Sequence, residues 1–379
     1  MDFPIFSRSF LLILWAQCVF FNTDILVFSI GIEVYQFYGV SGYSFLYLLM
    51  LVPGMILSKV IGKVIDKKPS FFILVTSIFS LLIISIVLYY INSMWAYYIF
   101  AFTSSILTQI AYISTSSAVS LATDSNKLAK AQGFQTTIKG LMYLGTPLLA
   151  NTVLHYYDFN LLVLLCGSIY IFLILSSLLF KGYFNYSSRI PSDKKEVLPL
   201  NRLFMSILPL QISYVIVLTY FNSYALSSKD ITTSNTVFSM IGIGGILGGI
   251  LCYNIVGSLN KNKLLAISFL LIIISYLSSF LPLIIFIAPV ALGIGYNLAF
   301  SLIRTHVKEE YRDSMIGTAL GAFQYYVGLG SLVGYIIAST FPIIVSSLHI
   351  SVALFITFLL CISMWLYMYD SNKRCEVRA

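Results

Sequence analysis

The chain has 379 residues, of which 59% are hydrophobic and only 9% are charged. Because an average soluble domain is about a quarter charged, too few polar side chains are present to cover a water-soluble globule. The net charge of +8 could point to nucleic acid, but the Lys and Arg residues form short clusters between apolar runs. Such clusters are typical of membrane topology signals, so we expect an integral membrane protein and no nucleic-acid partner.

Twelve runs are long and apolar enough to cross a bilayer as helices, which takes roughly 20 residues. Several are separated by only a few residues, which favours helical hairpins over a β-barrel with its short alternating strands. The run that follows Arg8 is too long for a signal peptide, so we expect it to be retained as the first span. The predicted spans are 10–32, 41–61, 71–91, 95–120, 133–155, 159–180, 203–225, 234–256, 264–282, 284–303, 315–341 and 347–369.

The basic residues predict the orientation of the spans. Of the 22 Lys and Arg residues, 21 fall on one side, among them Arg304 and Lys308, which we assign to the loop after the tenth span. Only Lys229 falls on the other side. Because basic residues gather on the cytoplasmic side of membranes, both termini are predicted to be cytoplasmic, in agreement with an even number of spans.

The longest polar break divides the spans into two groups of six. We therefore expect an N-terminal six-helix bundle (1–181), a cytoplasmic linker (182–202), a C-terminal six-helix bundle (203–370) and a basic cytoplasmic tail (371–379).

The two halves share residues at a constant offset of 189, which indicates a duplication. Two parallel six-span repeats are typical of transporters whose halves rock about a site near the bilayer midplane. The recurring residues are Asp124-Ser125 with Asp313-Ser314, Phe134-Gln135 with Phe323-Gln324, and Gly145 with Gly334.

The loop between the second and third spans carries a Gly-x-x-x-Asp-Lys signature at Gly62, Asp66 and Lys67, which Lys68 extends. With this signature the chain resembles the major facilitator superfamily over nearly all of its length. The resemblance implies a twelve-helix, all-α secondary transporter. It also implies that the glycine permits close helix contact, and that the acid latches one conformational state by interacting with a neighbouring helix N-terminus.

A plainer interpretation, a solvated topology signal, explains Lys67 and Lys68 but not the glycine–acid spacing. The second half keeps only Gly257, Lys261 and Lys263, without an acid. If a latch exists, we expect it to be asymmetric.

Three further segments are similar to the macrolide-efflux-type branch of drug exporters. Two features that drug–proton antiporters usually share are altered in this chain. The fourth span lacks an arginine, and the Gly-Pro motif of the fifth span is loosely represented by Gly140, Gly145 and Pro147. The similar segments are Asp124 to Gly145, Glu309 to Asp313, and Leu14 to Gln17 with the acid Asp24.

Two acidic residues are candidates for proton coupling. Asp24 lies about fourteen residues into the first span, where a charge costs roughly 2.5–3.5 kcal/mol and should face an aqueous cavity or a partner. A carboxyl group there can take up a proton in one conformation and release it in another, although a hydrogen-bonded structural role is the alternative. Glu33, near the outer end of the same span, is either a second coupling acid or a solvated helix-end carboxylate.

Polar residues within the other spans are candidates for a substrate cavity, although each could instead make an interhelical hydrogen bond. Lys139 could bind an anionic substrate or Asp24, or its stem could let the ammonium reach the lipid headgroups. The 27 tyrosines and 29 phenylalanines would allow an aromatic cavity. The candidates are Gln17, Gln109, Tyr112, Gln135, Lys139, Gln211, Tyr214, Asn222, Asn297 and Gln324.

The sequence shows no metal-ligand set, no hydrolytic triad and no nucleotide motif, so we expect neither a cofactor nor an enzyme. The glycine-rich stretch from Gly242 to Gly249 lacks the strand and the Lys-Ser/Thr pair of a phosphate loop, and is better explained by close helix packing. The five cysteines form no CxxC pair.

Taken together, the residues and the resemblance predict a proton-coupled exporter of a small amphiphilic compound, such as an antibiotic, a peptide-like or another secondary metabolite. We expect a monomer in the bacterial cytoplasmic (inner) membrane, with a small-molecule substrate and protons as partners. Two alternatives stay open: a uniporter or importer of a polar solute, and a non-transporting immunity or sensor protein on a transporter scaffold.

Overall fold

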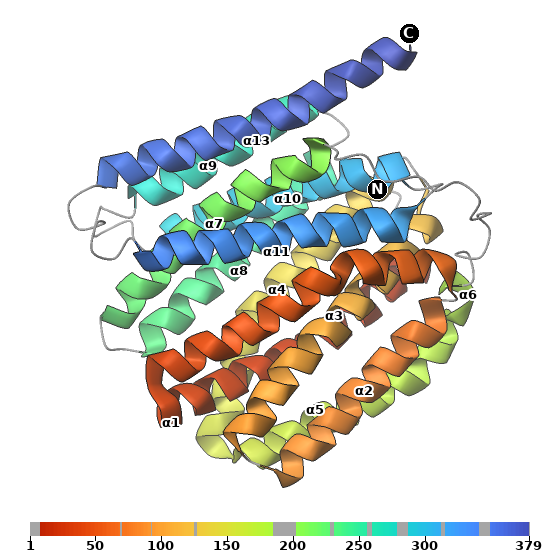
Figure 1. Cartoon of the computed structure of the whole chain (residues 1–379), viewed down its shortest axis with the longest axis vertical. Helices are drawn as coiled ribbons and strands as arrows, with labels where there is room; N and C mark the ends of the chain where they lie inside the picture. Colours follow the sequence, from red (N-terminus) through yellow and green to blue (C-terminus); the bar gives the residue numbers. More distant parts are fainter. Residues whose placement is uncertain are drawn as a thin grey trace. The chain divides into compact units, whose positions relative to one another are not determined.

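The computed structural model describes residues 8–68, 70–91, 93–124, 127–184, 202–227, 231–255, 260–278, 287–311, 315–340 and 349–378. Every regular element in these ranges is a helix (Figure 1). The helices are α1 (Arg8–Lys67), α2 (Ser70–Tyr90), α3 (Met94–Ala122), α4 (Leu128–Tyr156), α5 (Phe159–Ser177), the 3-10 turn η2 (Leu178–Phe180), α6 (Lys181–Phe184), α7 (Arg202–Ser227), α8 (Ile231–Ile255), α9 (Lys261–Ser278), α10 (Ala288–Tyr311), α11 (Ile316–Thr340) and α13 (His349–Arg378).

Helix α1 contains the first two predicted spans, because it bends sharply at Gly39 (φ 65°, ψ −161°). Glycine adopts positive φ without the steric cost that a side chain would impose. In Figure 1 the red ribbon of α1 reverses its direction at this point. The bend leaves two apolar arms, Phe10–Gly39 and Ser41–Lys67, each long enough to cross a membrane.

Each predicted span coincides with a helix over its described part, which confirms a multi-pass, all-helical protein. Within the described ranges, eight helical segments are long and apolar enough to cross a membrane, and Ser239–Asn254 and Val352–Met368 are shorter apolar helices. The total of twelve spans and the cytoplasmic termini stay predictions. Arg304 and Lys308, however, lie inside α10 rather than in a loop.

Two of the tight turns between helices carry side-chain caps. Ser93 accepts a hydrogen bond from the Ala96 backbone N–H (3.3 Å) at the start of α3, and Asp158 accepts one from the Leu161 N–H (2.8 Å) at the start of α5. Both are favoured N-cap residues because their side-chain oxygens satisfy N–H groups that lack a partner in the first helical turn. Capping explains why only a few residues separate these helices from the preceding ones.

The chain forms two compact units. In the first unit α1 packs against α3 and α5, and α2 packs against α3 and α5; in the second, α7 packs against α13 and α8, and α13 against α9. The first unit comprises Met1–Ser125, Gly145–Lys195 and Tyr311–Tyr325, and the second comprises Asn126–Leu144, Glu196–Glu310 and Tyr326–Ala379.

The start of α11 therefore belongs to the first unit and the start of α4 to the second. These starts, Ile316 and Leu128, are 188 residues apart, within one residue of the sequence offset between the halves. The prediction of two six-helix bundles (1–181 and 203–370) concerns which helices move together, and it stays a prediction. Most of the predicted linker 182–202 lies outside the described residues.

Candidate functional site

In the first unit, the carboxylate of Asp66 at the end of α1 binds the first turn of α11. Its Oδ1 accepts a hydrogen bond from the Gly317 N–H (2.7 Å), and its Oδ2 accepts from the N–H (2.7 Å) and the Oγ1 hydroxyl (2.6 Å) of Thr318. The first turn of a helix has N–H groups without an intrahelical partner, and the helix dipole favours a negative charge there. Asp66 thus caps a helix that begins 250 residues further along the chain.

Glycines bring the two backbones into contact at this point. A Cβ atom on Gly62 would clash with the carbonyl oxygen of Gly317, and one on Gly317 would lie 2.6 Å from Asp66 Oδ1. A Cβ on Gly321, one turn further along α11, would clash with the Ser58 carbonyl oxygen. Because Gly62 and Asp66 are four residues apart, they share one helix face, so the same face both approaches α11 and caps it.

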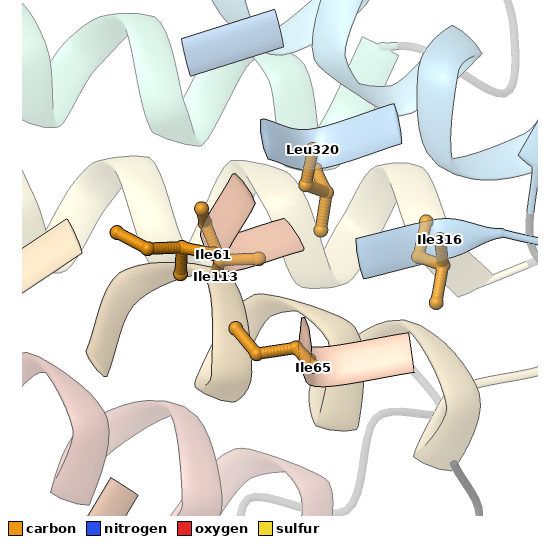
Figure 2. Packing of buried hydrophobic residues seen from close by; sticks show 5 residues of the cluster. All are labelled: Ile61, Ile65, Ile113, Ile316 and Leu320. Atoms are coloured by element: carbon orange, nitrogen blue, oxygen red, sulfur yellow. The ribbon is translucent and has the colours of Figure 1, made fainter. Parts of the chain in front are cut away.

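An apolar cluster surrounds the capped helix start. It joins Ile61 and Ile65 of α1, Ile113 of α3, and Ile316 and Leu320 of α11, and each is at most 8% exposed. Figure 2 shows these side chains meeting around the α1–α11 contact. A dry surrounding strengthens the electrostatic part of the hydrogen bonds to Asp66.

The lysines around the signature differ in their surroundings. Lys67 and Lys68 are exposed. By contrast, the Lys59 ammonium lies 3.6 Å from the ring centroid of Tyr325 in α11, a cation–π geometry. The residues that α11 supplies to these contacts, Gly317, Thr318 and Tyr325, were not among the predicted site residues.

We expect Gly62→Ala to destabilise the protein, although alanine is usually better than glycine in a helix by about 1 kcal/mol. The added methyl would force the backbones apart, and overpacking typically costs about 1–3 kcal/mol. The matched control is Gly182→Ala in α6, where a Cβ would meet nothing within 4 Å. Thermal unfolding in detergent would measure both, and an unchanged midpoint for Gly62→Ala would contradict the close contact.

In the second unit, the start of α4 meets α8 through close backbone packing. A Cβ on Gly133 would lie 2.6 Å from the Tyr253 nitrogen and 2.8 Å from the Gly249 carbonyl oxygen, and the Cys252 thiol points at the Ala129 carbonyl oxygen (3.9 Å). Small residues with four-residue spacing permit such an approach of helices. Three residues of the signature are kept in the second half. Of these, Lys261 pairs with Glu309 (2.8 Å), Lys263 is exposed, and Gly257 lies outside the described residues.

A row of polar side chains joins α4 to α10 in the same unit. The ammonium of Lys308, which is only 1% exposed, donates to Gln132 Oε1 (3.0 Å), and Gln132 Nε2 donates to Thr136 Oγ1 (3.4 Å). Thr136 and Ser301 share a hydrogen bond (2.7 Å). A buried polar group is costly unless it is hydrogen-bonded, so this row accounts for a lysine that the sequence analysis had placed in a loop.

The two acids predicted for proton coupling lie in the first arm of α1. Asp24 is half-buried, and it interacts electrostatically with Tyr170 of α5, whose hydroxyl is hydrogen-bonded to Thr23 (2.8 Å). Glu33, also half-buried, interacts electrostatically with Tyr97 of α3. Nine residues correspond to about 13 Å along a helix, so the structure does not bring the two carboxyl groups together.

Some of the cavity candidates come together in the second unit. Gln211 donates from Nε2 to Ser331 Oγ (2.9 Å) and accepts at Oε1 from the Tyr296 hydroxyl (2.6 Å). The rings of Tyr214 and Tyr296 stack with centroids 3.8 Å apart. Ser331 and Tyr296 were not among the predicted residues. Asn297, which was, instead donates to the Gly293 carbonyl of its own helix (2.9 Å).

The remaining candidates differ in their surroundings. Gln17 and Gln324 are buried, and Tyr112 packs its ring edge-on against Phe20 at 5.8 Å. In the part of the chain that the structure describes, Gln109 Oε1 and Gln135 Oε1 are buried without a hydrogen-bond partner. The side chain of Asn222 lies outside the described residues.

The described residues contain no group of three His, Cys, Asp or Glu side chains that could hold a metal ion. Of the cysteines, Cys166 and Cys252 are buried, Cys18 is partly buried and Cys361 is exposed, all as free thiols.

Solved structures with a similar fold include an organic anion transporter and a homologue of an iron transporter. The human organic anion transporter MFSD10 is 12% identical, with a TM-score of 0.71 over 95% of this chain and 100% of that one. A bacterial homologue of the iron transporter ferroportin is 14% identical in its outward-facing state (TM-score 0.71; 97% and 100% covered), and 15% identical in that state with soaked iron (TM-score 0.73; 96% and 99% covered). At these identities the likeness shows the fold alone.

Comparison with curated proteins finds no match for the chain. The family model for the Major Facilitator Superfamily, however, matches residues 12–335, which is most of the chain and includes Gly62, Asp66 and the start of α11. The chain therefore belongs to the Major Facilitator Superfamily.

Proposed function

We propose that the chain is a secondary active transporter that exports a small amphiphilic compound by alternating access, driven by inward proton flow across the bacterial cytoplasmic membrane. Family membership supports membrane transport, and the resemblance to macrolide-efflux-type exporters supports the direction. The observation that carries alternating access is the contact of Asp66 with the first turn of α11.

This contact has the properties of a latch between two discrete states. A hydrogen bond to a charged group contributes about 1.5–3 kcal/mol, and Asp66 accepts three that converge on one helix turn. The backbones of α1 and α11 approach so closely at Gly62 and Gly317 that a Cβ atom at either position would clash. Conformational switching requires packed elements that have two discrete arrangements rather than a continuous range.

Proton coupling is proposed for Asp24, with Glu33 as the second candidate. A membrane potential supplies about 2.3 kcal/mol per charge per 100 mV. Since about 1.4 kcal/mol corresponds to a factor of ten, one proton moved through 100 mV would support a substrate gradient of roughly fifty-fold. One coupled acid is therefore enough to drive useful export.

The proposal is tested in everted membrane vesicles that hold an imposed pH gradient, read out with a pH-sensitive dye. Anionic, neutral and cationic amphiphiles are added in turn, and vesicles without the protein serve as the control. We expect at least one class to dissipate the gradient only when the protein is present. Substrate exchange without any effect on the gradient would favour the uniporter, and the absence of both would favour the non-transporting class.

A further inference from the structure

Lys139 of α4 carries an ammonium group that points towards side chains of the second unit. It lies eleven residues after Leu128, the first residue of α4, which corresponds to about 16 Å along a helix. It is half-buried, and its Nζ lies 5.4 Å from the ring centroid of Tyr143 and 5.9 Å from that of Phe300. Because Phe300 is only 7% exposed, the ammonium is directed inward rather than along the helix towards its start.

The rings near Lys139 continue into an aromatic cluster, which we define as Tyr143 of α4, Tyr214 of α7, and Tyr296 and Phe300 of α10. Phe300 contacts Tyr296 with ring centroids 5.6 Å apart, and Tyr296 stacks on Tyr214 at 3.8 Å with an interplanar angle of 18°. Tyr143 joins the cluster through Lys139, whose ammonium lies close to the rings of both Tyr143 and Phe300. Three helices thus contribute to one aromatic surface. This surface is partly exposed, because the side chains of Tyr143 and Tyr214 are not fully buried.

The amide of Gln211 beside this surface is already hydrogen-bonded through both of its polar atoms. Gln211 uses its Nε2 on Ser331 and its Oε1 on the Tyr296 hydroxyl, so it fixes the Tyr296 ring in place. Lys139 has three N–H donors, whereas the contacts that the structure gives it, in the part of the chain described, are ring faces. A ring face attracts an ammonium but offers no oxygen acceptor.

We propose that Lys139 and the aromatic cluster form a recognition site for an amphiphilic organic anion. A carboxylate or a similar oxyanion would accept hydrogen bonds from Lys139, and a planar apolar body would lie against Tyr214 and Tyr296. A cation of the same shape would gain the ring contacts but be repelled by the ammonium. The inference rests on the proposed function, because it names the substrate class of the transporter.

An anionic lipid headgroup offers the same oxyanion chemistry, so the two sources have to be separated. Lys139 lies six residues inside the predicted span 133–155, about 9 Å along a helix, so it lies within the span rather than among the headgroups at its end. The ammonium also lies near the buried ring of Phe300, so it faces side chains of α10. We therefore assign the site to a soluble amphiphile and include lipid as an arm of the test.

The test measures binding of three matched probes, 1-naphthoate, 1-naphthylmethanol and 1-naphthylmethylammonium, to the full-length protein in phosphatidylcholine nanodiscs. We expect the anion to bind about tenfold more tightly than the cation, since one buried charge interaction is commonly worth more than 1.4 kcal/mol. Lys139→Met should remove this preference without changing binding of the neutral probe, and Lys139→Arg should retain it.

The matched control is Lys130→Met. Lys130 is on the same helix and also lies over a ring, 5.9 Å from the centroid of Tyr253. It is exposed, however, and it lies thirteen residues before Tyr143, or about 20 Å along a helix. We expect no change in the three affinities. Equal losses in the two lysine variants, or equal binding of the anionic and cationic probes by the parent, would overturn the proposal.

Phosphatidylglycerol in the nanodiscs provides the lipid arm. If it displaces naphthoate from the parent, and Lys139→Met no longer binds phosphatidylglycerol, the site belongs to a headgroup and the substrate assignment is wrong. Selective naphthoate binding without transport in proteoliposomes would instead refute the proposed function and leave the site intact. Transport that shows no preference for anions would refute the site alone.

Discussion

Replacing Asp66 by alanine is expected to release the start of α11 and to lower the transport rate about tenfold or more. The substitution removes the acceptor of three hydrogen bonds and leaves the N–H groups of Gly317 and Thr318 without their partner. A single lost bond to a charged acceptor, at about 1.5–3 kcal/mol, already shifts a two-state equilibrium by about tenfold or more. Asp66→Asn keeps the shape with one carbonyl oxygen, so an intermediate effect is expected.

Thiol labelling reports the release directly. Ala319 in α11 is 0% exposed, so a cysteine there, in a protein without its native cysteines, should react slowly with a maleimide. Adding Asp66→Ala should speed that reaction while transport falls. The control is Lys67→Ala, which removes an exposed neighbouring charge. Unchanged labelling in Asp66→Ala, or an equal loss of transport in Lys67→Ala, would contradict the latch.

The sequence was sufficient to single out Gly62 and Asp66, because they match the family signature, but it placed them in a loop, whereas α1 continues to Lys67. The resemblance implied that Asp66 binds the N-terminus of a neighbouring helix, but the sequence was not sufficient to find which helix. The donors are mainly backbone N–H groups of Gly317 and Thr318, and every residue except proline carries such a group. The one usable signal was the four-residue spacing of Gly317 and Gly321, which permits close approach but names no partner.

Buried charges were the hardest feature to predict. Lys308 follows an apolar run and resembles a solvated loop cation, yet it lies in α10 at 1% exposure. Its partner Gln132 is 176 residues away and uncharged, so neither local charge nor hydropathy could indicate the contact. The same limit applies to Lys139, whose ring partners lie on its own helix and on α10.

The predicted end of the first span differs from the end of its helix for a different reason. The first span was predicted to end at residue 32, but its helix continues to Gly39. The intervening Phe37 and Tyr38 are exposed, at 71% and 44%. Exposed aromatic side chains do not interrupt a helix, whereas a positive φ does, and only glycine takes that conformation readily.

Replacing Asp24 by asparagine is expected to abolish substrate accumulation driven by a pH gradient and to leave downhill exchange intact. Asparagine is close in shape and can hydrogen-bond, but it cannot carry a proton between the two sides. Since one coupled proton supports a gradient of roughly fifty-fold per 100 mV, its loss should reduce accumulation about tenfold or more. Exchange at equal pH needs only the conformational change, so it should continue.

Proteoliposomes loaded with substrate allow both quantities to be measured on one preparation. The matched control is Asp158→Asn, because Asp158 caps α5 through its side chain and asparagine caps equally well. Glu33→Gln separates the two candidate acids, and a loss of accumulation in this variant alone would move coupling from Asp24 to Glu33. Normal accumulation in both variants would mean that neither acid couples protons, and a lost exchange in Asp24→Asn would point to a structural role for this acid beside Tyr170.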